Sequence, residues 1–146
     1  MRDDFVLHEL LVKDCYRIAD WPLCRVLLMD DTHYPWLVLV PRVPSAKDLD
    51  ELDDETLTAC MREVSLASRR LKELTKAHKI NVAALGNQCP QLHIHIIARY
   101  REDAAWPGPV WGKAPLSPYP AATGVFGAMP VEEMLNRLRS SLGTPE

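Results

Sequence analysis

The chain has 146 residues, of which 47% are apolar and 25% are charged, as expected for one globular domain. Its net charge of −3, from 17 basic and 20 acidic residues, argues against DNA or RNA as a partner, because proteins that bind them usually carry a basic surplus. No apolar stretch approaches the roughly 20 residues that cross a bilayer, and the first residues lack a signal-peptide pattern. The four cysteines are widely spaced and do not suggest a disulfide framework. We therefore expect a reduced, cytoplasmic protein with no membrane partner.

Two apolar runs open the predicted sheet. Residues 23–29 and 36–40 are rich in strand-forming residues, and the turn signal Asp30-Asp31-Thr32 lies between them. This order predicts an antiparallel hairpin. Because both runs are apolar on both sides, we expect a helix to cover one face. A short helical turn is expected in the polar connection 45–53, which contains a possible capping box at Ser45–Asp48.

A long helix is predicted at 54–79, where apolar residues recur with a period near 3.6. Two further strands follow, at 80–85, stopped by Gly86-Asn87, and at 91–100. Strands, one long helix and more strands are typical of an α+β fold with a mainly antiparallel sheet.

The C-terminal part changes character. Six of the 12 prolines and four of the six glycines lie between Pro107 and Pro130, which excludes regular helix and central strand there. Its tryptophan Trp111 indicates that it packs on the body, and we expect Trp111 and Trp36 to be packing residues, with base stacking as the alternative. A short helix is predicted at 131–142. We expect a single domain over 1–146, with a core at about 5–103 and this Pro/Gly-rich tail with its helix at 104–146, whose task is open: dimer contact, pocket lid or inert packing.

The chemistry is concentrated in the last predicted strand, Gln91-Leu-His-Ile-His-Ile-Ile97. Residues two apart on a strand share a face, so the apolar residues between them point into a core. The polar side chains therefore point the other way: Gln91, His93, His95 and, further on, Arg99. A pair of imidazoles on one face fits nucleophilic catalysis, metal binding or simple ligand binding, and it also occurs incidentally on exposed strands.

At this point the sequence resembles the histidine-triad (HIT) superfamily of nucleotide hydrolases and transferases, whose pattern alternates three histidines with apolar residues. The resemblance covers roughly residues 20–100 and looks most like the bacterial branch described as diadenosine-tetraphosphate-hydrolase-like. The matching features are the triad stretch, the strand Val26–Asp30 that ends in an acid, the strand Leu37–Pro41 that ends in proline, the long helix, and Gly86-Asn87 before the triad.

The resemblance implies a role for each matching residue. His93 would attack the α-phosphorus of a purine nucleotide conjugate and form a covalent nucleotidyl-histidine, which water then hydrolyses. His95 would donate to a phosphate oxygen or assist the leaving group. The predicted catalytic residues are therefore His93, His95 and Gln91, and the predicted substrate-binding residues are Gly86, Asn87, Gln88, Arg99 and, for the ribose, Asp30 with Asp31 as its competitor. The resemblance also implies a homodimer.

The departure from the family pattern is Gln91, which stands where the first histidine is expected. An amide can donate and accept hydrogen bonds, but it cannot relay a proton at neutral pH. No protein-bound metal is required by this chemistry, although Mg²⁺ could accompany a polyphosphate substrate.

Two other functions stay open. Gln91 motivates a nucleotide-binding or regulatory protein with little turnover. The His-x-His pair motivates a metal-binding cupin-like β-barrel, although six residues, and not five, separate Gly86 from His93 and a long helix fits poorly in that fold. The sequence leaves the leaving group and the base preference undetermined.

Overall fold

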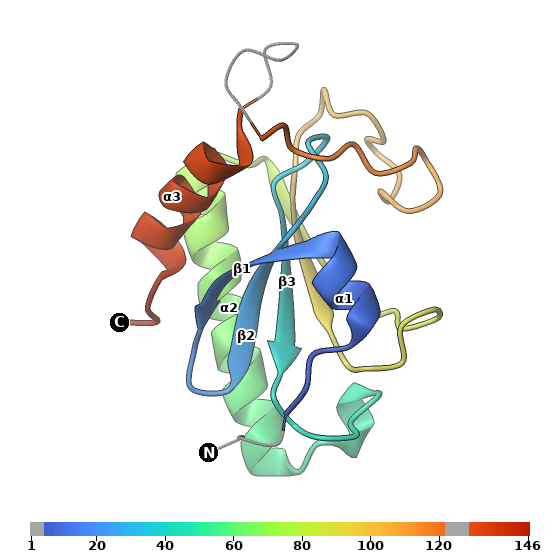
Figure 1. Ribbon diagram of the computed structural model, residues 1–146, viewed down its shortest axis with the longest axis vertical. Coiled ribbons are helices and arrows are strands. Elements are labelled where there is room, and N and C mark those ends of the chain that lie inside the picture. Colours follow the sequence, from blue (N-terminus) through green and yellow to red (C-terminus); the bar gives the residue numbers. More distant parts are fainter. Residues whose placement is uncertain (1–4, 122–128) are drawn as a thin grey trace.

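The computed structural model describes residues 5–121 and 129–146 and shows one five-stranded sheet with helices on both faces (Figure 1). The strand order is β1-β2-β3-β5-β4, and every neighbouring pair is antiparallel. The strands are β1 Cys15–Asp20, β2 Cys24–Met29, β3 Trp36–Pro41, β4 Lys79–Ala83 and β5 Ile94–Arg99. The helices are α1 Glu9–Asp14, α2 Asp54–Thr75 and α3 Val131–Leu142, with a 3₁₀ turn, η1, at Leu49–Glu51. The predicted α+β class is confirmed.

Most predicted elements are present with shifted ends. The hairpin is the β2–β3 pair, and α3 covers the predicted residues. Helix α2 ends four residues earlier than predicted because Lys76 takes the left-handed conformation (φ 55°), which terminates the helix. Strand β5 begins only at Ile94, so Gln91 and His93 precede it. Helix α1 and strand β1 were not predicted from the sequence.

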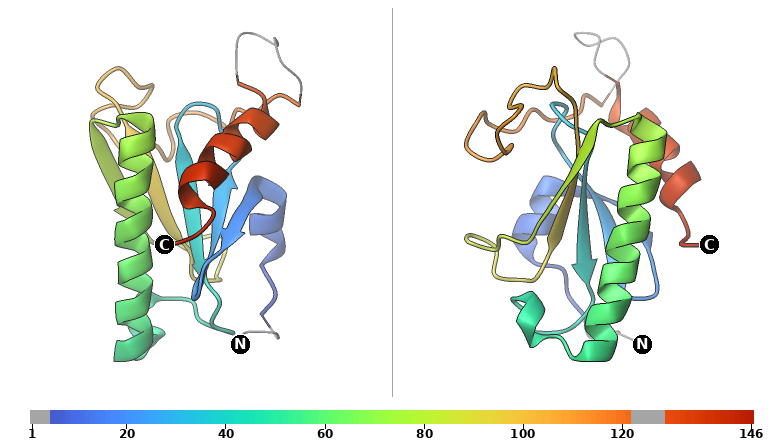
Figure 2. Two further views of the ribbon diagram at one scale, coloured as in Figure 1. Left: turned by 90° about the vertical axis from the view of Figure 1, so that its left-hand side faces the viewer. Right: turned by 180° about the vertical axis from the view of Figure 1, so that it is seen from behind.

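One face of the sheet is covered by two helices, α2 and α3 (Figure 2). Alternate residues of β3 and β5, such as Leu37 and Ile96, point into this layer and are fully buried. They meet a stripe of small and branched side chains on α2: Cys60, Val64, Ala67 and Leu71. The indole N–H of Trp21 donates to the carbonyl of Leu142 (2.9 Å) and ties the end of α3 to the sheet.

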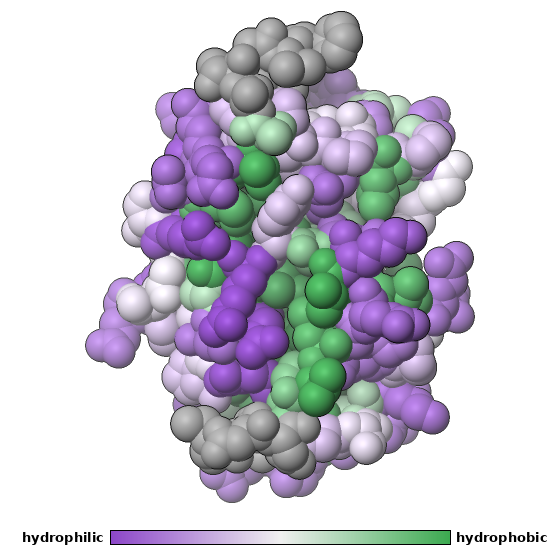
Figure 3. Space-filling view, in the orientation of Figure 1, coloured by the Kyte–Doolittle hydropathy of each residue, from purple (hydrophilic) through white to green (hydrophobic). Residues whose placement is uncertain are grey.

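The opposite face is covered by short and irregular chain. Trp36 and Val38 of β3 and Ile97 of β5 point this way, and Leu11 of α1 and Val110 of the segment 101–121 pack over them. Figure 3 shows this side of the molecule, where apolar surface gathers around α1, on which Val12 is exposed. The side chains between this cover and the sheet form the candidate site.

Among the described residues, no helix is long and apolar enough to span a membrane. All four cysteines lie in the described part of the chain and are free thiols.

Candidate functional site

His93 and His95 line a cavity of 360 Å³ on the face that carries α1. This volume lies within the range of small-molecule sites. The walls come from four parts of the chain: Leu11 and Asp14 of α1, Met29 and Trp36 at the ends of β2 and β3, residues 85–89 after β4, and Trp111 and Leu116 of the segment 101–121. The predicted residues Gly86, Asn87 and Gln88 are thus brought together with the two histidines.

His93 is held by the backbone of the residue two before it. Its Nδ1 lies 2.7 Å from the carbonyl oxygen of Gln91. Because a carbonyl can only accept, Nδ1 carries a proton, and in the neutral form of the ring the lone pair lies on Nε2. Within the described chain, no protein group is hydrogen bonded to Nε2. In that form the ring has a free nucleophilic nitrogen.

His95 is fixed by a different partner, the indole of Trp36. The indole Nε1 lies 3.0 Å from Nδ1 of His95. The contact follows from the strand register, since His95 pairs with Val38 and Trp36 is the diagonal neighbour on the same face. Burial, followed by the neighbouring His93, lowers the pKa of His95 from 6.5 to about 3.

The aromatic rings around His95 form a packed wall. The centroid of His95 lies 4.9 Å from that of His93 and 5.0 Å from that of Trp111, and Trp36 meets Trp111 at 5.8 Å, all edge to face. Three parts of the chain supply these rings: β3, the stretch at the start of β5, and the segment 101–121. The irregular C-terminal region therefore contributes directly to the site.

Gln91 does not present its side chain to this cavity. Its Oε1 accepts from the N–H of His8 (2.8 Å) and its Nε2 donates to the carbonyl of Val6 (2.9 Å). The side-chain amide thus anchors the segment before α1 through one accepted and one donated hydrogen bond. Gln91 lies three residues before β5 begins, and its side chain reaches this segment and not the cavity. What Gln91 supplies to the site is its backbone carbonyl.

The expectation that Arg99 adds charge to a phosphate site is corrected by the structure. Arg99 is 1% exposed and forms an ion pair with Asp103 (2.7 Å). Its remaining donors are bonded to the side chain of Asn81 and the carbonyl of Gly108. Four residues along a strand span roughly 13 Å, so Arg99 shares the face of His95 but not its cavity.

The acidic residue in the cavity is also not the predicted one. Asp30 accepts from the N–H of Tyr119, and the buried Asp31 accepts from the N–H and ring of His33, so both carboxylates are engaged outside the cavity. Asp14 lines it instead, and it is the only Asp, Glu, Lys or Arg among the described residues that line the cavity. No sequence signal identified Asp14, because a six-residue helix offers too little periodicity.

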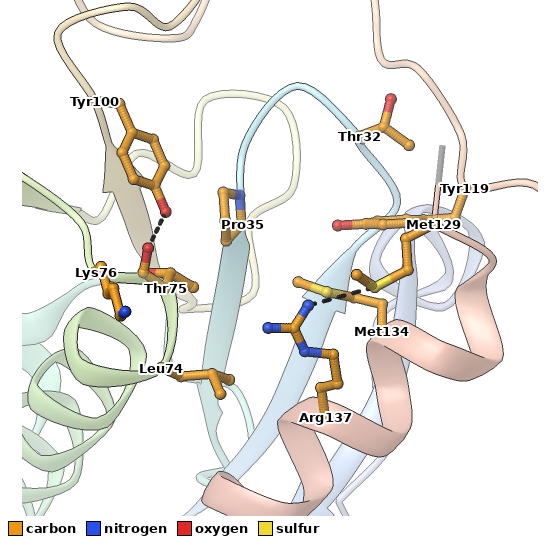
Figure 4. Close-up of a pocket in the computed structure, with 10 residues that line it drawn as sticks. All are labelled: Thr32, Pro35, Leu74, Thr75, Lys76, Tyr100, Tyr119, Met129, Met134 and Arg137. Atoms are coloured by element: carbon orange, nitrogen blue, oxygen red, sulfur yellow. Dashed lines mark hydrogen bonds between the residues drawn. The ribbon is translucent and has the colours of Figure 1, made fainter. Parts of the chain in front are cut away.

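A second, larger cavity of 470 Å³ lies between helix α3 and the C-terminal end of α2 (Figure 4). Leu74 and Met134 form apolar walls, and Lys76 and Arg137 add cations, with the Arg137 guanidinium close to Met129. Neither histidine of the pair reaches it. Size alone therefore does not locate the chemistry, and we assign the candidate active site to the cavity with His93.

The chain belongs to the HIT family, because the HIT domain profile matches residues 11–102, which span the sheet, α2 and the histidine pair. Among solved structures, it is similar to histidine triad proteins from Bradyrhizobium japonicum (45% identity, 94% of this chain and 97% of that chain, TM-score 0.85) and Marinobacter aquaeolei (43%, 94% and 96%, 0.85). A histidine triad protein from Sinorhizobium meliloti matches at 36% identity over 97% of this chain and 99% of that chain, with a TM-score of 0.88. No curated protein matches significantly.

Family membership overturns the cupin alternative. The sheet is open, with α2 and α3 packed on one face, and not a β-barrel. Among the described residues, no cluster of three or more His, Cys, Asp or Glu side chains is placed to hold a metal ion.

Proposed function

We propose that this protein is a nucleotide hydrolase or nucleotidyl transferase that acts at the α-phosphate of a purine nucleotide conjugate through a covalent nucleotidyl-histidine. The observation that carries the proposal is the hydrogen bond between Nδ1 of His93 and the Gln91 carbonyl, which leaves Nε2 as the attacking atom in the cavity. The family match supports nucleotide chemistry, and the resemblance to diadenosine-tetraphosphate hydrolases supports a conjugate of this type.

The first step forms one bond and breaks one. The lone pair of Nε2 forms a bond to the α-phosphorus, while the bond from phosphorus to the leaving group breaks and its electron pair departs with the leaving group. The ring of His93 then carries a positive charge, which the Gln91 carbonyl stabilises through Nδ1–H. In the second step water attacks phosphorus, the electron pair returns to Nε2, and a proton passes to solvent.

The cavity walls suggest how the substrate is held. Gly86 has a positive φ of 72°, which turns the chain so that the following residues, Asn87 and Gln88, line the cavity. Their amide groups can donate to phosphate oxygens. The carboxylate of Asp14 is suited to accept from ribose hydroxyls, in place of Asp30. The apolar surface of Met29 and Trp111 offers a place for the base.

Partner and cofactor follow from the same proposal. The resemblance implies a homodimer, which sedimentation of the purified protein would test. The chemistry needs no metal bound by the protein, and Mg²⁺ would arrive with a polyphosphate substrate. The free thiols of all four cysteines are in keeping with a reducing cytoplasm.

A second candidate function is nucleotide binding with little turnover. Gln91 favours it, because an amide relays no proton and because this side chain also directs its hydrogen bonds to the segment before α1 and not into the cavity. This protein would bind nucleotides at the same walls but would form no covalent intermediate.

Product analysis with diadenosine tetraphosphate and adenosine phosphoramidate separates the two functions. The wild type is expected to release AMP from at least one substrate, and His93→Ala is expected to lose at least about 10³-fold in rate, since the nucleophile is gone. His78→Ala, which changes an exposed histidine outside the cavity, is the matched control and should keep the wild-type rate.

Mass spectrometry of the quenched reaction should then find one nucleotidyl group on His93. Binding of nucleotide by the wild type without AMP release would favour the binding protein. Equal turnover by His93→Ala would refute the proposed nucleophile.

A further inference from the structure

The hydrogen bond between Trp36 and His95 determines where the proton of His95 lies. An indole N–H can only donate, so the Nδ1 atom that it meets at 3.0 Å must be unprotonated. The neutral ring of His95 therefore carries its proton on Nε2. His93 has the opposite arrangement, with the proton on Nδ1. The two neighbouring imidazoles are thus held in complementary tautomers, one with a free lone pair and one with a free N–H.

The surroundings of His95 also oppose a positive charge on its ring. His95 is 5% exposed and Trp36 is 4% exposed, and Trp111 covers a further edge. Protonation would place a cation in this aromatic wall and would break the bond from Trp36. The titratable side chains that share the cavity are His93, Asp14 and Cys89, and none of them is hydrogen bonded to His95 in the described chain. Burial and His93 lower the pKa of His95 to about 3, in agreement with this geometry.

Within the described chain, no other side chain can replace His95 as a proton donor to a leaving group in this cavity. The Gln91 amide is bonded to the segment before α1. Arg99 is held by Asp103 outside the cavity. Asn87 and Gln88 are amides, which donate hydrogen bonds but do not release protons. Burial raises the pKa of the Cys89 thiol and makes it a weaker acid, and the Asp14 carboxylate accepts hydrogen bonds and does not donate them. The cavity therefore offers hydrogen bonds to a leaving group but no general acid.

We propose that Trp36 is a positioning residue that holds His95 as a neutral hydrogen-bond donor, and that the site therefore selects conjugates whose leaving group departs as an anion. This inference rests on the proposed function and specifies its leaving group. When Nε2 of His93 bonds to phosphorus, the bond to the leaving oxygen breaks and the oxygen keeps the electron pair. A phosphate or weakly basic phenolate oxygen carries this pair without a proton, whereas an amine or a strongly basic oxygen needs one.

Two aryl esters of AMP test the selectivity. The p-nitrophenyl and phenyl esters share nucleoside, phosphate and ring, but p-nitrophenolate is much less basic than phenolate, whose conjugate acid resembles tyrosine. We expect the kcat/KM of the wild type for the p-nitrophenyl ester to be at least about 10²-fold higher than for the phenyl ester. This factor is the rate enhancement that a general acid usually supplies and that the phenyl ester would lack here. Cleavage of both esters at equal rates would overturn the inference and leave the proposed function intact. If the wild type cleaves neither ester, the proposed function is refuted, and this inference is refuted with it.

Trp36→Phe tests the positioning role, because it removes the N–H and keeps an aromatic ring. Without this donor the Nδ1 lone pair loses its partner, so the pKa of His95 rises and the proton can occupy either nitrogen. We expect the ratio of the two kcat/KM values to fall about tenfold, the effect of one hydrogen bond, and to fall further toward low pH. In the wild type this ratio should stay constant from about pH 5 to pH 8.

Trp106→Phe is the matched control. Trp106 packs on His78 and Arg99, outside the cavity, and its replacement should leave the wild-type ratio unchanged. An unchanged ratio in Trp36→Phe at every pH would overturn the positioning role.

Nitrogen NMR of the His95 ring reads the tautomer without any turnover. In the wild type we expect a protonated Nε2 and an unprotonated Nδ1 from about pH 5 to pH 8, and in Trp36→Phe a mixture of tautomers. An imidazolium, or a protonated Nδ1, in the wild type would overturn the inference whatever the esters show.

Discussion

The two faces of the sheet carry different kinds of cover, and strand β5 shows the difference within six residues. Ile94 and Ile96 point toward α2, where apolar side chains meet apolar side chains and no direction is required. His95 and Arg99 point toward α1 and the segment 101–121, where each of these two side chains is held by a specific polar partner. In the described chain, no fully buried side-chain nitrogen or oxygen lacks a hydrogen-bond partner.

This difference indicates a division of labour. The helix-covered face supplies stability that depends on packing and is indifferent to pH. The other face positions polar groups, and its stability depends on charge and on directional bonds. Substitutions on the two faces should therefore differ in their effects on the free energy of unfolding, on its pH dependence and on kcat. Four substitutions, in order of decreasing effect, test the comparison.

The largest loss of stability is expected from Asp103→Asn. Asp103 and Arg99 form an ion pair with side chains 3% and 1% exposed. Removal of one partner leaves an uncompensated buried charge, so we expect a loss of about 3–5 kcal/mol in the free energy of unfolding by urea denaturation. Asp20→Asn, at an ion pair whose Asp side chain is 21% exposed, should cost about 1 kcal/mol or less. Equal losses would contradict the assigned roles.

Leu71→Ala should destabilise the packing on the face covered by α2 and α3. Leu71 is fully buried between α2 and the sheet, and its truncation leaves a cavity that costs about 2–5 kcal/mol. Below the unfolding transition, kcat should stay at the wild-type value because the site lies on the far side of the sheet. Val12→Ala, at an exposed position of α1, should change the free energy of unfolding by less than about 0.5 kcal/mol. Loss of kcat in folded Leu71→Ala would show that the faces are coupled.

The pH dependence of stability should come from the polar face. The pKa of His95 is lowered from 6.5 to about 3 in the folded chain, so between these values the unfolded chain binds the extra proton. Stability should therefore fall as pH decreases below about 6.5, by up to about 1.4 kcal/mol for each pH unit.

A further loss should appear as pH falls from about 4 to 2. Burial would raise the pKa of Asp103, but hydrogen bonds from Arg99 and three backbone N–H groups lower it from 3.8 to about 2. Chemical denaturation at several pH values measures both slopes. His95→Gln should reduce the dependence of the free energy of unfolding on pH below about pH 6.5. His78→Gln, at an exposed histidine, should leave this dependence unchanged. An unchanged slope in His95→Gln would assign the effect to another group.

The smallest effect is expected from Gln91→Ala. The variant loses two hydrogen bonds to the segment before α1, at about 1 kcal/mol each, but it keeps the carbonyl that orients His93. We expect kcat to fall by less than about tenfold and proteolysis near Val6 to become faster. A loss of kcat as large as that of His93→Ala would show that the side chain itself takes part in catalysis.

The sequence predicted what depends on local pattern. The hairpin, helix α2 and the shared face of His93 and His95 follow from periods of 2 and 3.6 in apolar residues. Strand β1 was missed because Arg17 is exposed at the sheet edge and the strand lacks a clear alternation. The alternation did not reveal that the Gln91 side chain bonds to the segment before α1 and stays out of the cavity.

The rest of the site depends on contacts between distant parts of the chain. Asp14 and Trp111 reach the cavity from other segments, 79 residues before and 18 residues after His93, and no periodicity links them to it. Trp36, the partner of His95, is its diagonal neighbour on the adjacent strand, and this contact depends on the register of β3 and β5. Arg99 was assigned to the site by its face alone, and the distance along the strand excludes it.

The aromatic wall also gives the protein an optical reporter of its own. Of the four tryptophans, Trp36 and Trp111 line the cavity, while Trp21 is buried beneath α3 and Trp106 packs on Arg99. A ligand that enters the cavity must displace water from these two indoles, so their fluorescence emission should shift on occupancy. Titration of the unlabelled protein, with Trp111→Phe as reference, would therefore measure affinity for any nucleotide, including analogues that are not cleaved.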